Sequence, residues 1–526
     1  MIEMICKDNN GRSFARIGGA NATVDLFAVP GVPNCFGLTS TNAEPQTTSS
    51  PLTMALISKW LENCLDSHPK CTHEGDPTLP TRVLDVGGIS SKSVKVVETC
   101  GGNGRYLCLS YCWGKSEFIK TTRKNLDDHK IAIQFDSLPQ VFQDTIEIAR
   151  TLGIRYVWID ALCILQNDEQ DWEAESKIMA DIYHRSYLTV AAASAGSVDE
   201  NCFSATRDTI ITGPVQSLFR PHFPYQAEET NECFPMRTRA WTYQERLLAP
   251  RVLYISRQEV LWECFEEKNC ECGFSTWYFG DVVDKSGFYD KCLQPAQEDY
   301  MLQNMWRQLV MEYSALNLSF PADKLPALSA LANTIFDRRG GGYAAGLWID
   351  TLVLDLCWSV TNTYETKCDF PWRAPTWSWA SIDSPIYFHI VRYYQQEIGE
   401  HRIHAEVREV YCPRQGSNRT GRVVAGSYIA LNCELMPVQQ KNIGMQAGSL
   451  DLISILDGRT ENDAIGEMFF IPLYSSDDTL SGIIVTPSAN STDNQFERVG
   501  FAYFVCDSQT EAFVNRGAGK RLIKLI

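Results

Sequence analysis

The strongest constraint on the fold is a regular alternation of strand-like and helix-like segments between Arg105 and Ala195. Short runs of apolar and β-branched residues mark the expected strands, and longer segments with apolar residues three and four positions apart mark the helices. The expected strands are residues 106–112, 155–160 and 186–195, and the expected helices between them are residues 137–153 and 171–183. This alternation predicts an α/β fold whose parallel sheet is covered by helices on both faces.

The helix expected at residues 137–153 has recognisable signals at both ends. Ser137 is the expected N-cap, Pro139 lies in the first turn and Gly153 marks the end. Apolar side chains at helical spacing predict one buried face, which consists of Leu138, Val141, Phe142, Ile146, Ala149 and Leu152.

The chain has 526 residues, which exceeds what a single simple core usually contains. Changes in composition predict five segments along it. These are a loosely ordered lead-in rich in Gly, Asn, Thr, Ser and Pro at 1–52, an extension packing on the core at 53–104, the α/β core at 105–250, a helical and mixed extension at 251–405, and a β-rich domain at 406–526. The last prediction rests on short apolar strands that alternate with turns.

The composition excludes several classes of partner. The 47 basic and 64 acidic side chains give a formal charge of −17, so we expect no nucleic-acid partner, because non-specific binding of nucleic acid needs a positive field. The sequence contains no apolar run of about 18 residues and no secretory signal, so we expect a cytoplasmic protein without a membrane span. The 19 cysteines are scattered and odd in number, which is typical of reduced thiols.

Two carboxylates stand out near the centre of the expected core. Asp160 directly follows an apolar strand, and ligands of open parallel sheets bind outside the carboxyl ends of the strands. Glu175 lies on the second expected helix, on the same face as the apolar residues of that helix. A carboxylate on a buried face indicates either a catalytic site or an ion pair, for which Arg155, Arg185 or a more distant arginine is a candidate partner.

A second polar cluster occupies residues 237–248, around Trp241. Its charged and polar members are Arg239, Gln244, Glu245 and Arg246. An arginine close to the strand-end acids would either neutralise them or hold a phosphate in a bidentate grip. The alternative is an amphipathic helix with a solvated charged face.

The sequence also contains a short group of potential metal ligands, Cys64, His68 and Cys71, with Cys270 and Cys272 far downstream. Zinc needs four ligands, and the Cys-x3-His-x2-Cys spacing departs from the standard ones. Because no second pair with standard spacing follows, we expect no metal site.

Residues 375–383 place Trp377 and Trp379 two positions apart, which predicts a strand with both rings on one face. Such a pair is usually core, and the alternative is an exposed platform for stacking or for a partner. The motifs of serine hydrolases, P-loop proteins, dinucleotide-binding folds and zinc proteases are all missing from the sequence.

Four long blocks of the sequence closely resemble the fungal heterokaryon-incompatibility (HET) domain family. They are "YLCLSYCWG", "LPQVFQDTIEIARTLGIRYVWIDALCILQ", "DWEAESKIMADIYHRSYLTVAAASA" and "RAWTYQERLLAPRVLYIS". The resemblance covers about 106–246 in order. The flanking stretches "CLDSHPKC" and "PTWSWASID" and the β-rich tail resemble the extended form of the family.

The resemblance implies a role in fungal self/non-self recognition and in the cell death that follows fusion of incompatible strains. It also implies a core similar to Toll/interleukin-receptor-like (TIR) domains, a flavodoxin-like α/β unit. Many TIR domains hydrolyse NAD with a glutamate on the helix after a central strand, and Glu175 matches that position.

On this hypothesis Asp160 joins Glu175 as a catalytic residue at the nicotinamide–ribose bond. The residues expected to hold the substrate are Ser110, Tyr111, Trp113, Arg239, Gln244 and Arg246. NAD is then a substrate, no cofactor is expected, and regulation requires a protein partner or self-assembly.

Two other classes of function remain open at this point. One is a non-catalytic interaction module in which Glu175 forms only a structural ion pair. The other is a repurposed enzyme of fungal secondary metabolism, such as a cyclase or hydrolase with an aromatic-lined pocket. A small polar pocket beside Glu175 favours the NAD hydrolase, a large apolar pocket favours the metabolic enzyme, and a saturated ion pair without a pocket favours the interaction module.

Overall fold

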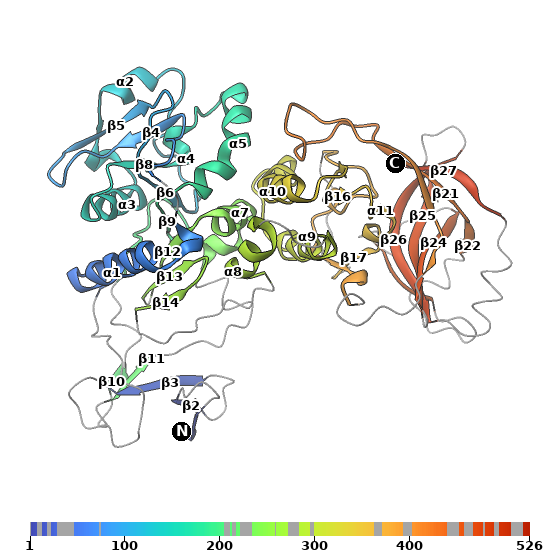
Figure 1. Ribbon diagram of the computed structural model, residues 1–526, viewed down its shortest axis with the longest axis horizontal. Coiled ribbons are helices and arrows are strands. Elements are labelled where there is room, and N and C mark those ends of the chain that lie inside the picture. The colour runs from blue at the N-terminus through green and yellow to red at the C-terminus, as the bar shows by residue number, and fades with distance from the viewer. Residues whose placement is uncertain are drawn as a thin grey trace. The chain divides into compact units, whose positions relative to one another are not determined.

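The computed structural model describes residues 2–7, 13–17, 23–28, 47–72, 75–204, 211–212, 217–220, 234–257, 259–271, 283–294, 299–361, 371–392, 402–438, 452–456, 467–476, 479–488, 494–505 and 519–526 (Figure 1). The chain folds as two compact units, Met1–Tyr289 and Asp290–Ile526. Among the described helices none is both long enough and apolar enough to cross a bilayer.

The first unit is built around a nine-stranded sheet with the order β14-β13-β12-β9-β6-β8-β4-β5-β7. Its strands are β4 (Arg82–Asp85), β5 (Ser93–Glu98), β6 (Tyr106–Ser110), β7 (Ile133–Gln134), β8 (Tyr156–Trp158), β9 (Leu188–Ala191), β12 (Arg251–Ile255), β13 (Val260–Cys264) and β14 (Lys268–Cys270). The neighbours β8, β6, β9 and β12 are parallel to one another, and the outer strands pair antiparallel.

The order of the parallel strands identifies the type of α/β fold. Along the chain they come as β6, β8, β9 and β12, but in the sheet the second strand lies outside the first. This is the strand order of flavodoxin-like folds. The predicted α/β class is confirmed, with a parallel centre inside a sheet that is mixed as a whole. Every residue of β6, β9 and β12 is buried, as expected for a parallel sheet that is covered on both faces.

The helices of this unit supply that cover. They are α1 (Pro51–Ser67), α2 (Leu126–Ile131), α3 (Gln140–Thr151), α4 (Asp160–Cys163), α5 (Glu169–His184), α7 (Ala240–Leu248) and α8 (Lys285–Phe288). The crossover helices α3 and α5 lie on opposite sides of β6 and β8 in Figure 1. Both helices were predicted, and α3 buries Val141, Phe142, Ile146 and Ala149 on its inner face as expected.

The start of α3 differs from the sequence prediction. Residue Ser137 belongs to a 3-10 turn, Phe135–Ser137, and its hydroxyl donates to the carbonyl of Gln134 at 2.7 Å. The helix begins at Gln140 after Pro139, so the predicted Ser137 cap is wrong. Gly153 follows the helix with φ of +71°, a left-handed conformation suited to a helix end.

A small antiparallel sheet with the order β1-β2-β3-β11-β10 also belongs to the first unit. Its strands are β1 (Ile2–Lys7), β2 (Ser13–Ile17), β3 (Thr23–Ala28), β10 (Ile211–Thr212) and β11 (Ser217–Arg220). Three of these strands come from the stretch that was predicted as a loosely ordered lead-in, whose other residues before 47 lie outside the described part of the chain.

The second unit contains helices and a β-rich sheet, and the β-rich C-terminal sheet was predicted. The helices are α9 (Asp299–Ser314), α10 (Ser329–Arg339) and α11 (Leu352–Asp355), and two short hairpins pair β15 (Tyr343–Ala344) with β16 (Leu347–Trp348) and β17 (Trp358–Val360) with β18 (Ile386–Phe388).

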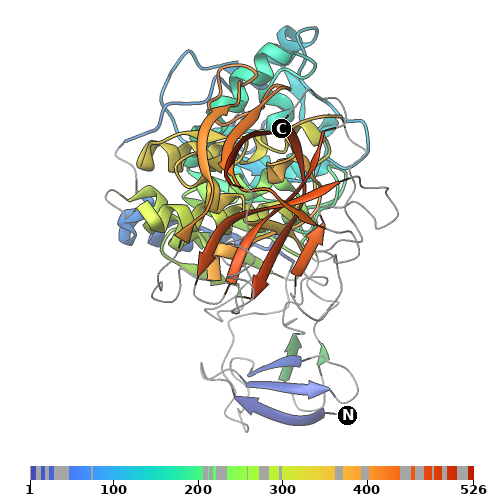
Figure 2. The ribbon, with the colours of Figure 1, turned by 90° about the vertical axis from the view of Figure 1, so that its right-hand side faces the viewer.

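The β-rich sheet supplies the orange and red strands of Figure 2. It has the order β19-β24-β25-β26-β27-β21-β20, with β22 beside β24 and β23 beside β26. Its strands are β19 (Arg402–Ile403), β20 (Glu406–Tyr411), β21 (Tyr428–Cys433), β22 (Met436–Val438), β23 (Leu452–Leu456), β24 (Met468–Ser476), β25 (Thr479–Pro487), β26 (Gln495–Val505) and β27 (Arg521–Leu525).

Residues 375–383 do not form the predicted strand. The side chain of Ser378 accepts a hydrogen bond from the amide of Ala380 at 3.0 Å, which closes a turn that continues into the 3-10 segment Trp379–Ser381. Trp377 and Trp379 are both fully buried, so the interpretation as core is confirmed and an exposed stacking platform is excluded.

Candidate functional site

Polar residues gather at the carboxyl ends of two neighbouring parallel strands. Ser110 is the last residue of β6, and Asp160 opens α4 two residues after β8 ends. Because β6 and β8 pair in parallel, these residues lie at the same edge of the sheet. The strand order reverses at β6, between β8 and β9, and ligands of open α/β sheets bind beside such a point.

Asp160 is held by three donors of its own chain. The Tyr111 hydroxyl donates to Oδ1 at 2.7 Å, the Trp113 indole donates to Oδ2 at 2.9 Å, and the amide of Ala161 donates to Oδ1 at 2.7 Å. Burial raises the pKa of Asp160, and the hydrogen bonds from Tyr111 and Trp113 oppose that rise. Burial also raises the pKa of Tyr111, so its hydroxyl stays protonated and donates.

A second carboxyl group, Glu245, reaches the same place from α7. The Ser110 hydroxyl donates to Oε2 of Glu245, and the Glu245 side chain is buried. Burial raises the pKa of Glu245 to about 7, and the negative charge of Asp160 adds to the rise. Ser110 and the positive charge of Arg239 oppose it. Asp160 and Glu245 therefore form an electrostatically linked pair with different surroundings, a pattern typical of acid–base sites.

Arg239 supplies the positive charge of this site. It precedes α7 directly, and its guanidinium donates to the carbonyl of Tyr111. Its charge lowers the pKa of both Asp160 and Glu245 against the effect of burial. Arg239 and Asp160 are only half-buried, so the site retains contact with solvent. We call Ser110, Tyr111, Trp113, Asp160, Arg239 and Glu245 the switch-point site.

Aromatic rings border the switch-point site. Trp113 and Phe118 meet edge to face with ring centroids 5.5 Å apart, and Nζ of Lys120 lies 4.7 Å from both centroids. Gly114 follows Trp113 with φ of +72°, and a Cβ at that position would stand 2.5 Å from Cβ of Ser197. The loop after β6 is therefore packed closely against the segment after β9. This combination of rings and cation suits a planar, charged ligand.

Glu175 is buried on the inner face of α5, as predicted, but in a different cluster. Its Oε1 lies 3.4 Å from the guanidinium of Arg82 on β4, which also pairs with Asp171 at 2.5 Å and donates to the carbonyl of Cys163 at 2.6 Å. Burial raises the pKa of Glu175, and the charge of Arg82 opposes this. The partner is Arg82, whereas Arg155 pairs with Asp85.

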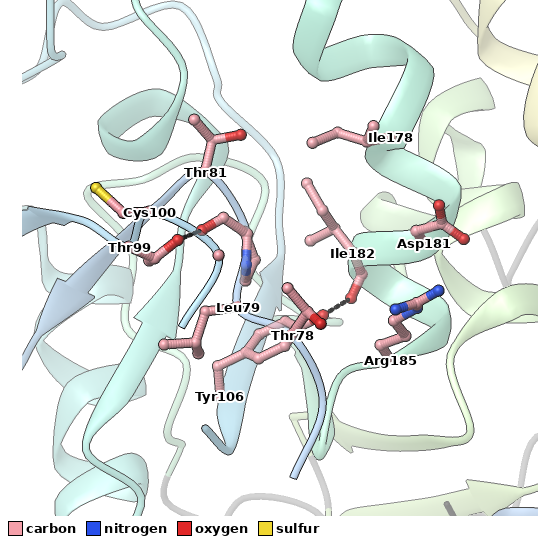
Figure 3. A pocket seen from close by; sticks show the side chains of 12 residues that line it. Thr78, Leu79, Thr81, Thr99, Cys100, Tyr106, Ile178, Asp181, Ile182 and Arg185 are labelled. Atoms are coloured by element: carbon pink, nitrogen blue, oxygen red, sulfur yellow. Dashed lines mark hydrogen bonds between the residues drawn. The ribbon is translucent and has the colours of Figure 1, made fainter. Parts of the chain in front are cut away.

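A pocket of about 340 Å³ lies beside this ion-pair cluster, between α5 and the segment before β4 (Figure 3). Thr81 lines the pocket on one side, while Asp181 and Arg185 of α5 line its opposite wall. The hydroxyl groups of Tyr106 and Thr99 donate to backbone carbonyls at 2.6 and 2.7 Å. Two hydroxyl groups of this pocket are therefore already engaged in hydrogen bonds to the backbone. Glu175 is not among the residues that line the pocket.

The two remaining predicted ligands are buried within α7. Arg246 donates through Nε and Nη2 to the two carboxyl oxygens of Glu263, each at 2.9 Å, and the Tyr254 hydroxyl donates to the same carboxyl at 2.7 Å. This places Arg246 in a bidentate pair that joins α7 to β12 and β13. Gln244 is also buried in α7.

The structure therefore brings together Ser110, Tyr111, Trp113, Asp160 and Arg239 from the predicted set. It adds Glu245, which was noted in the polar cluster but not selected as a site residue. The sequence did contain a signal for Glu245. It stands between Gln244 and Arg246, which were both selected, in a helix of nine residues that begins directly after Arg239.

Comparison with known proteins gives one match. Residues 106–245 match the family model described as "Heterokaryon incompatibility protein (HET)". No curated protein and no solved structure matches the chain. The matched region begins with β6 and ends at Glu245, so it spans the whole switch-point site. Residues 106–245 therefore form a domain of the heterokaryon-incompatibility (HET) family.

Proposed function

We propose that the HET domain of this chain cleaves the nicotinamide–ribose bond of NAD at the switch-point site, as the effector step of fungal self/non-self recognition and cell death. One observation carries the proposal: two carboxyl groups in unequal environments, Asp160 and Glu245, share the charge of Arg239 at the carboxyl ends of β6 and β8. Paired carboxyl groups of this kind serve glycosidic cleavage in many enzymes.

The chemistry needs no external reagent other than water. The bond between ribose C1′ and the pyridinium nitrogen breaks, and its electron pair neutralises the nicotinamide ring. The Asp160 carboxylate stabilises the positive charge that develops on the ribose. Water adds to C1′ and gives a proton to the Glu245 carboxylate, so the products are nicotinamide, ADP-ribose and a proton.

The other residues of the site hold the substrate in this account. Arg239 pairs with the pyrophosphate, and Trp113 with Phe118 offers an aromatic surface to a planar ring. The loop after β6 contains a single glycine, Gly114, and lacks the glycine-rich turn that retains a dinucleotide cofactor. NAD is therefore assigned as a substrate and not as a resident cofactor.

Glu175 receives a structural role in this proposal. TIR domains place their catalytic glutamate on the helix after a central strand, and Glu175, on α5 after β8, is the residue that the resemblance matches to it. Its carboxyl group, however, already pairs with Arg82. The assignment of the reaction to Asp160 and Glu245 therefore departs from the TIR pattern. Substitution of Glu175 and of Glu245 in separate variants compares the two assignments directly.

The test is nicotinamide release from NAD by the purified full-length chain at high protein concentration, beside Asp160→Asn and Glu173→Gln. Glu173 lies on the outer side of α5 and pairs with Lys177, so its substitution is a control for changes of charge. We expect release by the wild type and by E173Q, and a loss of about 100-fold or more in D160N. Equal release by a folded D160N variant would contradict the proposal.

A second candidate function is a protein-interaction module that performs no chemistry. The observation that favours it is the saturation of Asp160, which already accepts three hydrogen bonds from its own chain. This candidate gains support if the wild type releases no nicotinamide and instead forms oligomers at the same concentration. The alternative of a secondary-metabolism enzyme stays a prediction. The pocket of Figure 3 has a volume of about 340 Å³ and combines apolar side chains such as Ile178 and Ile182 with the charged Asp181 and Arg185.

A further inference from the structure

Four side chains with metal-binding atoms meet where the end of α1 approaches β13. Cys64 lies on the last turn of α1, His68 directly follows α1, Cys71 ends the 3-10 turn Pro69–Cys71, and Cys264 is the last residue of β13. One ligand atom from each of them lies within 4.8 Å of the other three. The four residues come from two segments that are about 190 residues apart in the sequence.

The spacing of these atoms is compatible with a tetrahedral metal centre. Metal–ligand distances of about 2.3 Å for sulfur and about 2.0 Å for nitrogen place tetrahedral ligand atoms roughly 3.5–3.8 Å apart. Sγ of Cys264 lies 3.4 Å from Nδ1 of His68. The three thiols are buried and none of them is in a disulfide.

The groups around the cluster also suit a bound cation with thiolate ligands. Nε2 of His68 lies 3.6 Å from the carboxylate of Glu267, so the opposite ring nitrogen faces the cluster, as in carboxylate–histidine–zinc arrangements. Nε of Arg251 lies 3.3 Å from Sγ of Cys64, and the amide of Glu267 donates to Sγ of Cys264 at 3.2 Å. Three thiolates with a divalent cation leave one negative charge, which Arg251 offsets.

We propose that Cys64, His68, Cys71 and Cys264 form a structural zinc site that fastens the end of α1 to the hairpin of β13 and β14. Three sulfur ligands and one nitrogen in a closed tetrahedron are typical of structural zinc, whereas catalytic sites leave a position open for water. The site is separate from the switch-point site and does not depend on the proposed reaction.

The fourth ligand is the one that sequence spacing did not indicate. The candidates there were Cys270 and Cys272, six and eight residues beyond Cys264. Cys270 packs instead in an apolar cluster with Cys112 and Ala191, and Cys272 lies outside the described residues. The antiparallel hairpin of β13 and β14 turns at Cys264, and this turn presents its thiol to the end of α1. The proposal thus opposes the sequence expectation of no metal.

The test is the metal content of the full-length chain, purified with a tag that contains no histidine, for the wild type, Cys264→Ser and Cys270→Ser. Cys270 is a matched control, since it is equally buried and lies on the partner strand. We expect about one zinc per chain in the wild type and in C270S, and at least a tenfold reduction in C264S. A full zinc content in C264S, or iron or copper in place of zinc, would overturn the proposal.

A second measurement keeps the test decisive if C264S fails to fold. The wild type is stripped of metal and titrated with cobalt, which reports tetrahedral geometry through its visible bands and thiolate ligands through near-ultraviolet charge transfer. We expect both signals to saturate at about one cobalt per chain and to vanish on addition of zinc. A wild type that holds no zinc and develops neither signal rules the site out.

Discussion

At the scale of single residues, the switch-point site depends on how burial changes the proton affinity of Glu245. Its pKa of about 7 in the folded chain lies above the ordinary value of 4.5, because burial disfavours the charged carboxylate. The folded state therefore binds this proton more tightly than the unfolded state does. The resulting contribution to stability is present below pH 4.5 and is lost as the pH rises through about 7.

The first prediction concerns the pH dependence of unfolding in Glu245→Gln. Between pH 5 and pH 8 the free energy of unfolding of the wild type should fall relative to that of the variant, by about 3 kcal/mol at most. Urea unfolding at both pH values measures the difference. Parallel pH profiles for the two proteins would show that Glu245 ionises normally in the folded chain.

The second prediction concerns the buried pair of Arg246 and Glu263. Glu263 has no exposed surface, and both of its carboxyl oxygens accept hydrogen bonds from Arg246. Arg246 strongly lowers the pKa of Glu263 against the effect of burial. Glu263→Gln removes the negative partner and leaves a buried guanidinium, so we expect a loss of about 3–5 kcal/mol in the free energy of unfolding.

Urea unfolding at neutral pH tests this expectation against a surface pair. Glu173 and Lys177 form an exposed ion pair on α5 at 3.5 Å. Glu173→Gln should change the free energy of unfolding by less than about 0.5 kcal/mol. Similar losses in the two variants would mean that the pair of Arg246 and Glu263 adds little beyond a surface contact.

At the scale of elements, the loop after β6 connects the strand core to the switch-point site. The third prediction is that Gly114→Ala destabilises the chain by about 1–3 kcal/mol, because a Cβ there meets Ser197 at 2.5 Å and the backbone is left-handed. Gly88→Ala is the matched control, since its Cβ would have no atom within 4 Å. The midpoints of urea unfolding compare them, and an unchanged midpoint in G114A contradicts the packing described here.

The strands marked by apolar runs, and the helices whose apolar residues recur every three or four positions, could be predicted from the sequence. The segments that became β6, α3, β8, α5 and β9 were all expected, and so was the burial of Glu175 on α5. Local patterns failed where a turn competes with them. Ser137 bonds backward to Gln134 and does not cap α3, and Ser378 closes a turn inside an alternating stretch.

Contacts between distant segments could not be predicted from spacing. Glu175 pairs with Arg82, which lies 93 positions earlier and reaches it only because β4 runs antiparallel beside β8. Cys264 meets Cys64 for a similar reason, since the hairpin of β13 and β14 positions its thiol. Both partners depend on the order of strands in the sheet, which a single sequence does not specify.

At the scale of the whole molecule, the two units have separate cores. All residues of the switch-point site and the four residues Cys64, His68, Cys71 and Cys264 belong to the first unit, Met1–Tyr289. The fourth prediction is that a fragment of residues 47–289 unfolds in a single cooperative thermal transition, because its central sheet is complete. Circular dichroism measures this transition, and a gradual, non-cooperative loss of signal would show that the first unit depends on the second.

The most direct test of the central claim compares Glu245→Gln with Glu175→Gln, both shown to be folded. The quantity measured is kcat/KM for nicotinamide release from NAD. If the reaction occurs at the switch-point site, E245Q falls by about 100-fold or more, while E175Q stays within about threefold of the wild type. Loss of activity in E175Q with full activity in E245Q would contradict the account and return the reaction to the cluster of Glu175 and Arg82.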